Sequence, residues 1–423
     1  MMRLIYTIIY YLIMPFILIR LLWRSKQTAD YRKRWNERFG FIPHLQNDSI
    51  WVHAVSVGET LAAIPLVKSL IQCYSPQFQI IVTTTTPTGS ALVIQHLQQQ
   101  VVHVYTPFDI PSTISRFLKK THVKLCIIME TELWPNLLTI CHKQKIPIIL
   151  ANGRLSERSS LRYQLIGKLT KQMLSAYHTV CAQGVLDGER YLRLGLDPKK
   201  LTITGNIKFD LHIPDELIQQ GKNLRQIIGI NRPVFIAAST HEGEETILLS
   251  AYQKIRHKIP TVFFILAPRH PNRCPKIAEW CRQTESQVVL RSTKKTIDQN
   301  THILLVDTIG ELQMIYAAAD IAFVGGSLVS VGGHNLIEPA ALGLPILTGP
   351  HLENFAEISK LLQNAGAAQF VSDADAIENA VIALCDADSL REKMGKCAQE
   401  TIKANRGALQ KHLDCIENCL SIQ

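Results

Sequence analysis

Glutamates that could do acid–base chemistry stand where apolar segments of the chain give way to loops. Glu59 is one of them, in the stretch His53-Ala-Val-Ser-Val-Gly-Glu-Thr60 that follows an apolar start at Ile50. A carboxylate on a loop can act as a general base that takes a proton from an attacking hydroxyl. A glutamate in the first turn of a helix also complements the helix dipole. This stretch by itself leaves both interpretations open.

Glu130 and Glu132 follow the apolar segment 124–129 in the stretch Met129-Glu-Thr-Glu-Leu-Trp-Pro-Asn136. Their spacing of two puts both carboxylates on one side of an extended chain. We expect one of them to orient a substrate and the other to cap the helix that begins at Trp134-Pro135. The residue types do not decide which carboxylate does which.

Lys208 lies in Gly205-Asn-Ile-Lys-Phe-Asp210, after the apolar segment 201–205. Its ammonium either offers a positive charge to a phosphate or carboxylate, or is an ordinary solvated group in a linker. Composition does not separate these two interpretations.

Polar residues also follow apolar segments in the second half of the chain. Ser239, Thr240 and His241 come after the segment 234–238 and are candidates for helix capping and anion contacts. Arg269 follows the segment 262–267, and its planar donor fork suits a phosphate or a pyrimidine carbonyl. Gly310 comes shortly after the segment 302–306 and allows backbone groups to approach a base edge.

The most distinctive stretch, Val324–Pro350, breaks an apolar strand with two glycine pairs, Gly325-Gly326 and Gly332-Gly333. A glycine-rich turn that leads into a helix presents free N–H groups, which suit a phosphate. We expect that helix to run from about His334 to Leu342, with Glu338 accepting hydrogen bonds from ribose hydroxyls. The stretch therefore indicates a nucleotide site, and the alternative is an ordinary strand–loop–helix crossover.

Several other chemistries lack their motifs in this sequence. GxxxxGK[ST], GxSxG and HExxH do not occur, which argues against P-loop NTPases, α/β-hydrolases and zincin proteases. The ten cysteines are scattered without a CxxC pair, which fits a reducing cytosol. The two DxD stretches, 373–375 and 386–388, lie near expected helix starts, so we interpret them as caps and predict no metal site.

These residues must be positioned by two successive α/β halves. Short apolar runs alternate with amphipathic segments, for example 65–72 and 161–176, which is typical of a parallel sheet covered on both faces. Because ligands of such sheets bind beyond the carboxyl ends of the strands, we expect the site in loops that face a shared cleft. The predicted strands are residues 50–56, 79–85, 101–106, 124–129, 147–152, 178–182 and 201–205, then 234–238, 262–267, 287–291, 302–306, 321–324, 346–348 and 367–371.

The chain begins with an apolar segment, Leu4 to Trp23, that is long enough to span a bilayer. Arg24, Lys26 and further basic residues follow it, so the positive-inside rule predicts a cytoplasmic location for the rest of the chain. A helix that lies in the membrane interface is the alternative. The net charge of +10 then favours an anionic membrane over nucleic acid as partner, because no arginine-rich arm is present.

Together these motifs resemble the 3-deoxy-D-manno-octulosonic acid (Kdo) transferases of Gram-negative bacteria over nearly the whole chain. The resemblance implies a GT-B glycosyltransferase with two Rossmann-like domains and an N-terminal anchor at the cytoplasmic face of the inner membrane. It also implies transfer of Kdo from CMP-Kdo to a lipid A precursor (lipid IVA), with inversion and without a metal or cofactor. The motifs are HAVSVGE, METELWPN, GNIKFD, STHEGEE, PRHP and GGSLVSVGGHNLIEPAALGLP.

The same resemblance assigns roles to residues. Glu59 is expected to be the general base, and Glu130 and Lys208 are expected to assist the transition state, with Glu130 against Glu132 as the least certain choice. A different GT-B enzyme that uses a UDP-sugar is the alternative function. The residues expected to line the CMP site are Pro268, Arg269, Ile309, Gly310, Glu311, Asn335, Leu336, Ile337 and Glu338.

The domain boundaries expected from these patterns follow the chain in order. Residues 1–24 form the anchor, 25–207 the acceptor-binding domain, 208–232 a linker, and 233–423 the CMP-sugar domain. The final helices of the last domain are expected to pack back across the halves.

Overall fold

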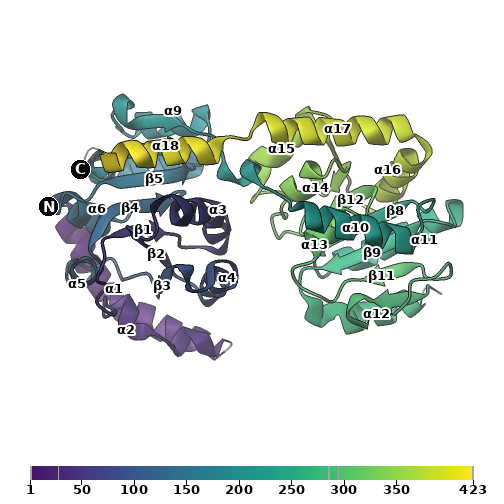
Figure 1. Ribbon diagram of the computed structural model, residues 1–423, viewed down its shortest axis with the longest axis horizontal. Coiled ribbons are helices and arrows are strands. Elements are labelled where there is room, and N and C mark those ends of the chain that lie inside the picture. The colour runs from purple at the N-terminus through teal and green to yellow at the C-terminus, as the bar shows by residue number, and fades with distance from the viewer. Residues whose placement is uncertain (1, 27, 284–285, 294, 422–423) are drawn as a thin grey trace. The chain divides into compact units, whose positions relative to one another are not determined.

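The computed structural model describes residues 2–26, 28–283, 286–293 and 295–421 (Figure 1). The chain forms two compact units. Unit 1 comprises Met1–Asp210 with Arg406–Gln423, and unit 2 comprises Leu211–Asn405.

Unit 1 is built on a seven-stranded parallel sheet in the order β3-β2-β1-β4-β5-β6-β7. Side chains from α5, α6, α8 and α9 cover one face, and side chains from α3, α4 and α18 cover the other. The strands are β1 (Ser49–His53), β2 (Gln79–Thr84), β3 (Val102–Tyr105), β4 (Val123–Met129), β5 (Ile148–Gly153), β6 (Thr179–Ala182) and β7 (Leu201–Ile203). The covering helices are α3 (Val57–Tyr74), α4 (Pro87–Leu97), α5 (Pro111–Thr121), α6 (Pro135–Lys143), α8 (Gly167–Ala176), α9 (Val185–Arg193) and α18 (Ala408–Ser421).

Shorter elements of unit 1 complete its edges. They are α1 (Met2–Arg24), η1 (Ala29–Arg32), α2 (Trp35–Arg38), η2 (Gln98–Gln100), α7 (Glu157–Leu165), η3 (Pro198–Lys200) and η4 (Ile207–Asp210). In the described part of the chain, α1 is the one helix that is long and apolar enough to cross a membrane.

Unit 2 repeats the architecture with a parallel sheet in the order β10-β11-β9-β8-β12-β13-β14. Its strands are β8 (Val234–Thr240), β9 (Phe263–Pro268), β10 (Val288–Leu290), β11 (Ile303–Leu305), β12 (Ile321–Val324), β13 (Ile346–Thr348) and β14 (Ala368–Phe370). Its helices are α10 (Asp215–Ile228), α11 (Glu244–Lys258), η5 (Pro271–Arg273), α12 (Cys274–Gln283), η6 (Arg291–Thr293), α13 (Leu312–Tyr316), α14 (Ile337–Ala341), α15 (Ala356–Asn364), α16 (Ala374–Asp386) and α17 (Asp388–Ala404).

Each of the fourteen predicted strands overlaps one of β1 to β14, which confirms the doubly wound class. The helix predictions were less accurate. The amphipathic segment 161–176 divides into α7 and α8 around Ile166, and the helix expected from His334 to Leu342 is only the five-residue α14. Both cases concern helix length, which local pattern fixes poorly.

The units differ from the expected domains at two places. The segment 208–232 is not a bare linker, because it contains the end of η4 and the whole of α10. The last helix, α18, belongs to unit 1 rather than to the second domain. Asp210 holds the start of that helix, since its carboxylate accepts hydrogen bonds from the N–H groups of Gly407 and Leu409, both at 2.6 Å.

Candidate functional site

Glu59 lies in the first turn of α3, just beyond the carboxyl end of β1. Ser56 is the N-cap residue, and its hydroxyl accepts from the Glu59 N–H at 3.2 Å and donates to Glu59 Oε1 at 2.8 Å. The Val55 N–H donates to Oε2 at 2.7 Å. The contacts form a variant of the capping box, in which the Glu59 carboxylate accepts from the N–H of the residue before the N-cap. A carboxylate has about four acceptor positions, so these two bonds still leave room for a substrate hydroxyl.

The environment of Glu59 suits proton transfer near neutral pH. The residue is only 7% exposed. Burial, with a further contribution from the charge of Glu132, raises the pKa of the Glu59 carboxyl to about 7, against the lowering effect of its two hydrogen bonds. A group that titrates close to the operating pH is a suitable general base. Glu59 thus lies in the first turn of a helix, as one interpretation of the sequence expected. Its raised pKa is also compatible with the other interpretation, a general base.

Glu130 and Lys208 meet at the same edge of the unit 1 sheet. Glu130 directly follows β4, and the Lys208 ammonium donates to Glu130 Oε1 at 3.0 Å. Both side chains are largely but not wholly buried, with 16% of Glu130 and 26% of Lys208 exposed. Lys208 is therefore not a freely solvated linker residue. Its ammonium has three N–H donors, and the two that Glu130 does not use can bind a ligand.

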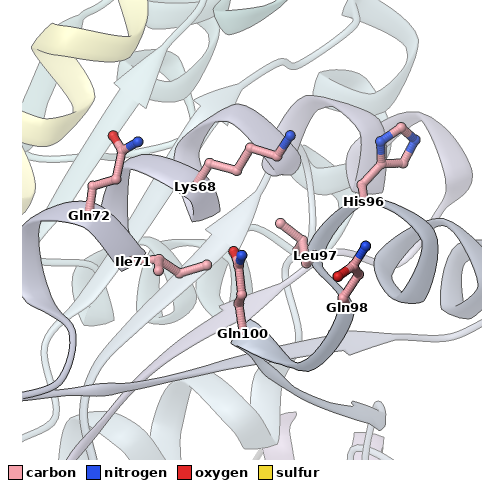
Figure 2. Close-up of a pocket in the computed structure, with 7 residues that line it drawn as sticks. All are labelled: Lys68, Ile71, Gln72, His96, Leu97, Gln98 and Gln100. Carbon is pink, nitrogen blue, oxygen red and sulfur yellow. The ribbon is translucent and has the colours of Figure 1, made fainter.

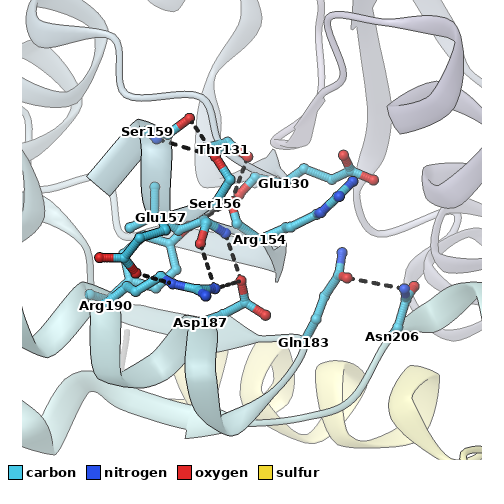
Figure 3. A network of polar contacts seen from close by, with 12 residues as sticks. Glu130, Thr131, Arg154, Ser156, Glu157, Ser159, Gln183, Asp187, Arg190 and Asn206 are labelled. Atoms are coloured by element: carbon cyan, nitrogen blue, oxygen red, sulfur yellow. Dashed lines mark hydrogen bonds and ion pairs between the residues drawn. The ribbon is translucent and has the colours of Figure 1, made fainter. Parts of the chain in front are cut away.

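Lys208 reaches Glu130 because η4 folds back over the ends of the neighbouring strands. Asn152, at the end of β5, accepts a hydrogen bond from the Ile207 N–H at 3.0 Å. Asn206 donates to Gln183 Oε1 at 3.0 Å and accepts from the Lys208 N–H at 3.0 Å. Figure 3 shows Gln183 and Asn206 side by side below Glu130. The turn is thus held by three side-chain amides, those of Asn152, Gln183 and Asn206, which are far apart in the sequence and which composition does not reveal.

Glu132 has a different environment from Glu130. Its carboxylate accepts a short hydrogen bond from the Trp134 indole N–H, and burial raises its pKa. The expectation that one carboxylate of this pair caps the following helix is wrong. Asp109 caps α6 instead, because its carboxylate accepts from the N–H groups of Asn136 at 3.1 Å and Leu137 at 2.7 Å. The Glu130–Lys208 contact favours Glu130 over Glu132 as the assisting carboxylate.

Arg154 is a residue of this edge that the sequence analysis missed. It follows β5, and Tyr191 donates to the carbonyl oxygens of both Arg154 and Glu130, at 3.3 and 3.5 Å. Thr131 donates to the Arg154 carbonyl at 2.6 Å. Figure 3 shows the Arg154 and Glu130 side chains extending in the same direction. The guanidinium has no hydrogen bond or ion pair within the described residues. The one signal of Arg154 in the sequence is a basic residue just after an apolar strand, which is too common to single it out.

The backbone is strained at three of these strand ends. Glu130 has φ of 57°, Asn152 has φ of 54°, and Ser239 in unit 2 has φ of 57°. Such left-handed conformations of non-glycine residues are unfavourable and collect at functional sites. At Ser239 the register between β8 and β9 shifts, so a bulge turns the end of β8.

In unit 2 the candidate residues follow four strands that are neighbours in the sheet, β11, β9, β8 and β12. Pro268 is the buried last residue of β9, and Arg269 beside it is exposed, with its N–H donating to Thr240 O at 3.0 Å. His241 and His334 lie with parallel rings and with their Nε2 atoms 2.8 Å apart. Burial lowers the pKa of His334 to about 4, and burial also lowers that of His241. The lowered pKa values favour the neutral form of both imidazoles.

The glycine-rich loop after β12 differs from the sequence prediction. Its first N–H groups are not free for a phosphate, because the fully buried Glu244 carboxylate accepts from Gly326 at 2.7 Å and from Ser327 and Leu328 at 2.9 Å. Glu244 also accepts from the His241 N–H at 2.8 Å. The loop is thus held by a carboxylate from the start of α11. The capping role expected for Ser239 and Thr240 is likewise not seen, since the N-cap of α11 is Gly243.

The loop after β11 exposes backbone rather than charge. Ile309 is 81% exposed, and Gly310 has φ of 89° with open space where a side chain would project. Glu311 points its carboxylate at Arg291, at 2.8 Å, and forms a short contact with the Thr308 hydroxyl, which together lower its pKa. The Glu311 side chain is therefore already paired with protein groups.

Asn335 to Glu338 cover the start of α14. Leu336 and Ile337 are buried, so their side chains serve the core and only their backbone can meet a ligand. Asn335 Oδ1 accepts from the Ile337 N–H at 3.1 Å. Burial raises the pKa of Glu338, whose carboxylate accepts from Gln313 at 3.4 Å and also interacts with Asn335. Glu338 is thus oriented by two amides, as a hydroxyl-binding carboxylate requires.

The candidate residues do not line a hollow that unit 1 carries beside α3. That hollow, of about 410 Å³, lies at the far end of α3 from Glu59 (Figure 2). Its lining includes Lys68, Gln72 and His96. In the described residues, no three His, Cys, Asp or Glu side chains gather as a metal site requires.

Two family models match the chain, one for each unit. The family described as 3-Deoxy-D-manno-octulosonic-acid transferase (kdotransferase) matches residues 33–211. The family described as Glycosyl transferases group 1 matches residues 232–401. The first covers Glu59, Glu130 and Lys208, and the second covers the candidate nucleotide residues of unit 2.

Whole-chain relatives agree with these family models. The chain is 42% identical over 421 residues to a 3-deoxy-D-manno-octulosonic acid transferase of Haemophilus influenzae, covering 99% of this chain and 98% of that protein. It is 35% identical over 381 residues to a 3-deoxy-D-manno-octulosonic acid transferase of Bordetella pertussis, covering 88% and 87% respectively.

Solved structures with low sequence identity share the fold. A glycosyltransferase from Rickettsia africae matches with a TM-score of 0.57 at 15% identity, covering 89% of this chain and 99% of that one. A UDP-GlcNAc 2-epimerase from Neisseria meningitidis matches with a TM-score of 0.56 at 16% identity, covering 86% and 100%. These likenesses confirm a GT-B-like architecture of two parallel-sheet domains. The family models and the 42% identical relative establish that the chain belongs to the 3-deoxy-D-manno-octulosonic acid (Kdo) transferase family, and it is a glycosyltransferase that transfers Kdo in lipopolysaccharide synthesis.

Proposed function

We propose that this protein transfers Kdo from CMP-Kdo to a lipid A precursor, lipid IVA, with inversion at the anomeric carbon. The observation that carries the proposal is Glu59, a buried carboxylate at a strand end whose pKa is raised to about 7. An inverting transfer needs one base on the acceptor hydroxyl, on the face opposite the leaving nucleotide. The proposal assigns the acceptor side of the reaction to unit 1 and the donor side to unit 2.

On the acceptor side, Glu59 takes the proton of the attacking hydroxyl as the new glycosidic bond forms. Lys208, held by Glu130, and Arg154, whose guanidinium has no partner among the described residues, supply positive charge at this edge of the unit 1 sheet. The acceptor and the transferred sugar both carry anionic groups, so such cations orient them and stabilise charge in the transition state. In this proposal Glu130 acts by positioning Lys208.

On the donor side, unit 2 holds the CMP group. Arg269 donates to the phosphate or to the base, and the exposed backbone at Ile309 and Gly310 contacts the base edge. Glu338, oriented by Gln313 and Asn335, accepts from the ribose hydroxyls. The Glu311 side chain holds Arg291 in place, so its contribution is to shape this loop. Pro268, Leu336 and Ile337 support these residues from the core.

We further propose that the transfer proceeds without a metal or other cofactor. As the bond to Kdo breaks, its electron pair stays on the phosphate of CMP, which gains one negative charge that Arg269 and backbone donors can stabilise. The expected result is full activity after dialysis against EDTA. Activity that disappears on chelation and returns with a divalent cation would refute this part.

We place the enzyme at the anionic inner membrane, on its cytoplasmic side. The support is the apolar helix α1 followed by Arg24 and Lys26, because basic residues next to such a segment favour the cytoplasmic side. The lipid acceptor gives this location a functional reason.

The donor assignment is tested by thermal protection with nucleotides. CMP is expected to raise the melting temperature of the protein, while UDP at the same concentration leaves it unchanged, because a ligand stabilises only the folded state that binds it. Protection by UDP and not by CMP would instead favour an enzyme that uses a UDP-sugar.

A further inference from the structure

The N-terminal helix α1 has two faces with different surroundings. One stripe of residues is buried or half-buried and recurs every three or four positions along the whole helix. This spacing is that of a helix packed against a partner along its length. The stripe consists of Tyr6, Thr7, Tyr10, Met14, Ile17, Leu18, Leu21 and Ser25.

The partner of this stripe is unit 1 itself. Near the start of α1, the Thr7 hydroxyl donates to Asn136 Oδ1 at 3.0 Å, and Asn136 donates in turn to the Asp109 carbonyl at 2.7 Å. In the middle, Met14 packs with Phe108 and Ile110, which follow β3. Figure 1 shows α1, in purple, beside the other elements of unit 1.

The far end of α1 is also fastened. Arg32, in η1, donates to the Ser25 hydroxyl at 2.7 Å, and that hydroxyl donates to the carbonyl of Leu22. The helix therefore contacts folded, water-soluble structure at its beginning, middle and end. If α1 crossed the bilayer in this position, the loops and helix ends beside it would enter the hydrocarbon, where their polar groups have no partners.

The opposite face of α1 is apolar and has no partner in the described structure. Large side chains on it are more than half exposed, in a row that extends over the full helix. An apolar patch of this extent marks a membrane or protein contact. The most exposed members are Leu4 at 62%, Leu12 at 68%, Phe16 at 70%, Ile19 at 61% and Trp23 at 64%.

A second apolar element adjoins α1. The end of α7 and the start of α8 expose Leu161 at 54%, Leu165 at 86% and Ile166 at 36%. Helix α8 packs against both α1 and α6. Burial and the nearby charge of Glu132 raise the pKa of Tyr163 in α7, and Glu132 also acts on Glu59. This junction therefore lies near the carboxyl edge of the sheet, where Glu59 and Glu130 are.

Basic residues accompany both apolar elements. Arg20, Arg24 and Lys26 accompany α1, and Arg158, Arg162 and Lys168 accompany the α7–α8 junction. Apolar side chains beside lysine and arginine are the pattern of segments that lie in the interface of an anionic bilayer. A soluble protein partner would not need this combination at two separate elements.

We propose that α1 lies in the plane of an anionic membrane surface while it stays docked on unit 1, and that Leu161, Leu165 and Ile166 enter the same leaflet. The carboxyl edge of the unit 1 sheet then adjoins the lipid headgroups. If the proposed function is correct, a lipid acceptor reaches Glu59 without leaving the bilayer.

The in-plane arrangement is tested by disulfide trapping in native membrane vesicles. The Thr7→Cys/Asn136→Cys protein is expected to form an intramolecular disulfide on mild oxidation, seen as a faster band on a non-reducing gel that reductant removes. Leu12→Cys/Asn136→Cys is the matched control, because Leu12 lies on the opposite face, and it is expected to form none. The two single variants of the first pair report any bridge to native cysteines. A first pair that stays reduced while the protein is membrane-bound would overturn the docked arrangement.

The second element is tested by flotation of the full-length protein with vesicles. Leu161→Glu/Leu165→Glu is expected to reduce partitioning into phosphatidylethanolamine–phosphatidylglycerol vesicles by about tenfold or more, because two large apolar side chains no longer enter the lipid. Ile230→Glu, at a site 69% exposed in unit 2, is the matched control and should leave partitioning unchanged. Equal partitioning of the double variant and the control would overturn the role of the α7–α8 junction.

Both readouts are independent of catalysis. Neither uses CMP-Kdo, an acceptor or a measured rate, so a failure of the proposed function would leave them unaffected. Vesicles of phosphatidylcholine alone separate the charge contribution, and the structure predicts weaker partitioning into them because the basic residues then lack anionic headgroups. Equal partitioning into both kinds of vesicle would contradict the part assigned to the basic residues.

Discussion

Lys208 donates a hydrogen bond to Glu130 at 3.0 Å, although the two residues lie 78 positions apart in the chain. The contact joins the turn after β7, at one edge of the sheet, to the end of β4 near its centre. It gives a positive charge a fixed position against Glu130, whose own charge acts on the buried Glu59, and leaves part of the Lys208 side chain exposed.

Loss of this ammonium should slow transfer without unfolding the protein. We expect Lys208→Met to lower kcat/KM by about 10²-fold, the magnitude typical of a lost donor that stabilises transition-state charge. Lys222→Met, at an exposed position of α10, is the matched control and should have wild-type kinetics. Steady-state rates with circular dichroism as a folding check measure the effect, and wild-type rates for Lys208→Met would refute it.

The pH dependence of the rate reports on Glu59. Burial raises its pKa to about 7, and only the ionised carboxylate can accept a proton. The rate should therefore fall tenfold per pH unit below about 7 and level off above it. Measurement of kcat/KM from acidic to mildly alkaline pH checks this, and a rate that is flat through pH 7 would exclude a base with this pKa.

Removing the charge of Glu59 should remove most of the catalysis. Glu59→Gln retains the size of the side chain and is expected to lose about 10²–10⁴-fold in kcat, which is what general base catalysis contributes. Donor binding should not change, because the CMP residues belong to unit 2. A Glu59→Gln protein that retains its kcat would remove Glu59 from the base role.

A substitution at Glu244 should weaken donor binding, which the Glu59 substitution leaves unchanged. Its carboxylate holds the N–H groups of Gly326, Ser327 and Leu328, so Glu244→Gln places an NH₂ group against N–H donors. We expect the affinity for CMP to fall by about tenfold or more, and unit 2 to lose about 1–3 kcal/mol of stability. Glu242→Gln, on a side chain 75% exposed, is the control. Calorimetric titration with CMP measures the difference, and equal affinity of the two variants would contradict it.

Arg154 is predicted to bind an anionic group of the substrates. Its guanidinium has no partner among the described residues, so Arg154→Ala should leave stability nearly unchanged and raise KM by about tenfold, as expected for a lost charge-assisted hydrogen bond. Arg154→Lys should recover part of this affinity. Lys119→Ala, at an exposed site in α5, controls for a simple change in net charge. An unchanged KM for both substrates in Arg154→Ala would exclude such a contact.

The strands were predictable from the sequence because most are short, nearly continuous apolar runs, and the central strands of both sheets are buried along most of their length. The position of α18 was not, because an amphipathic helix fits either sheet, and the cap from Asp210 shows only in three dimensions. The break of the predicted helix at Ile166 shows the same limit, because Gly167 alone marks the boundary between α7 and α8, and a single glycine inside a helical pattern does not by itself end a helix.

Some parts of the candidate site could also be predicted from the sequence, and others could not. Glu59, Glu130 and Lys208 were identified from residue type and position after strands, and the structure brings the last two into contact. The occupied N–H groups of the glycine-rich loop could not be predicted, because the sequence does not show that the Glu244 side chain turns toward Gly326. Arg154 was missed because one arginine after a strand is common, and only its lack of a partner makes it informative.

The most direct test of the proposed function is incubation of the protein with CMP-Kdo and a tetraacylated lipid A precursor, followed by mass spectrometry of the lipid. The account predicts a lipid product heavier by one or more Kdo residues, with one CMP released for each residue added and no product from Glu59→Gln. An unmodified lipid after incubation with CMP-Kdo, together with a glycosylated lipid when a UDP-sugar is supplied, would contradict it.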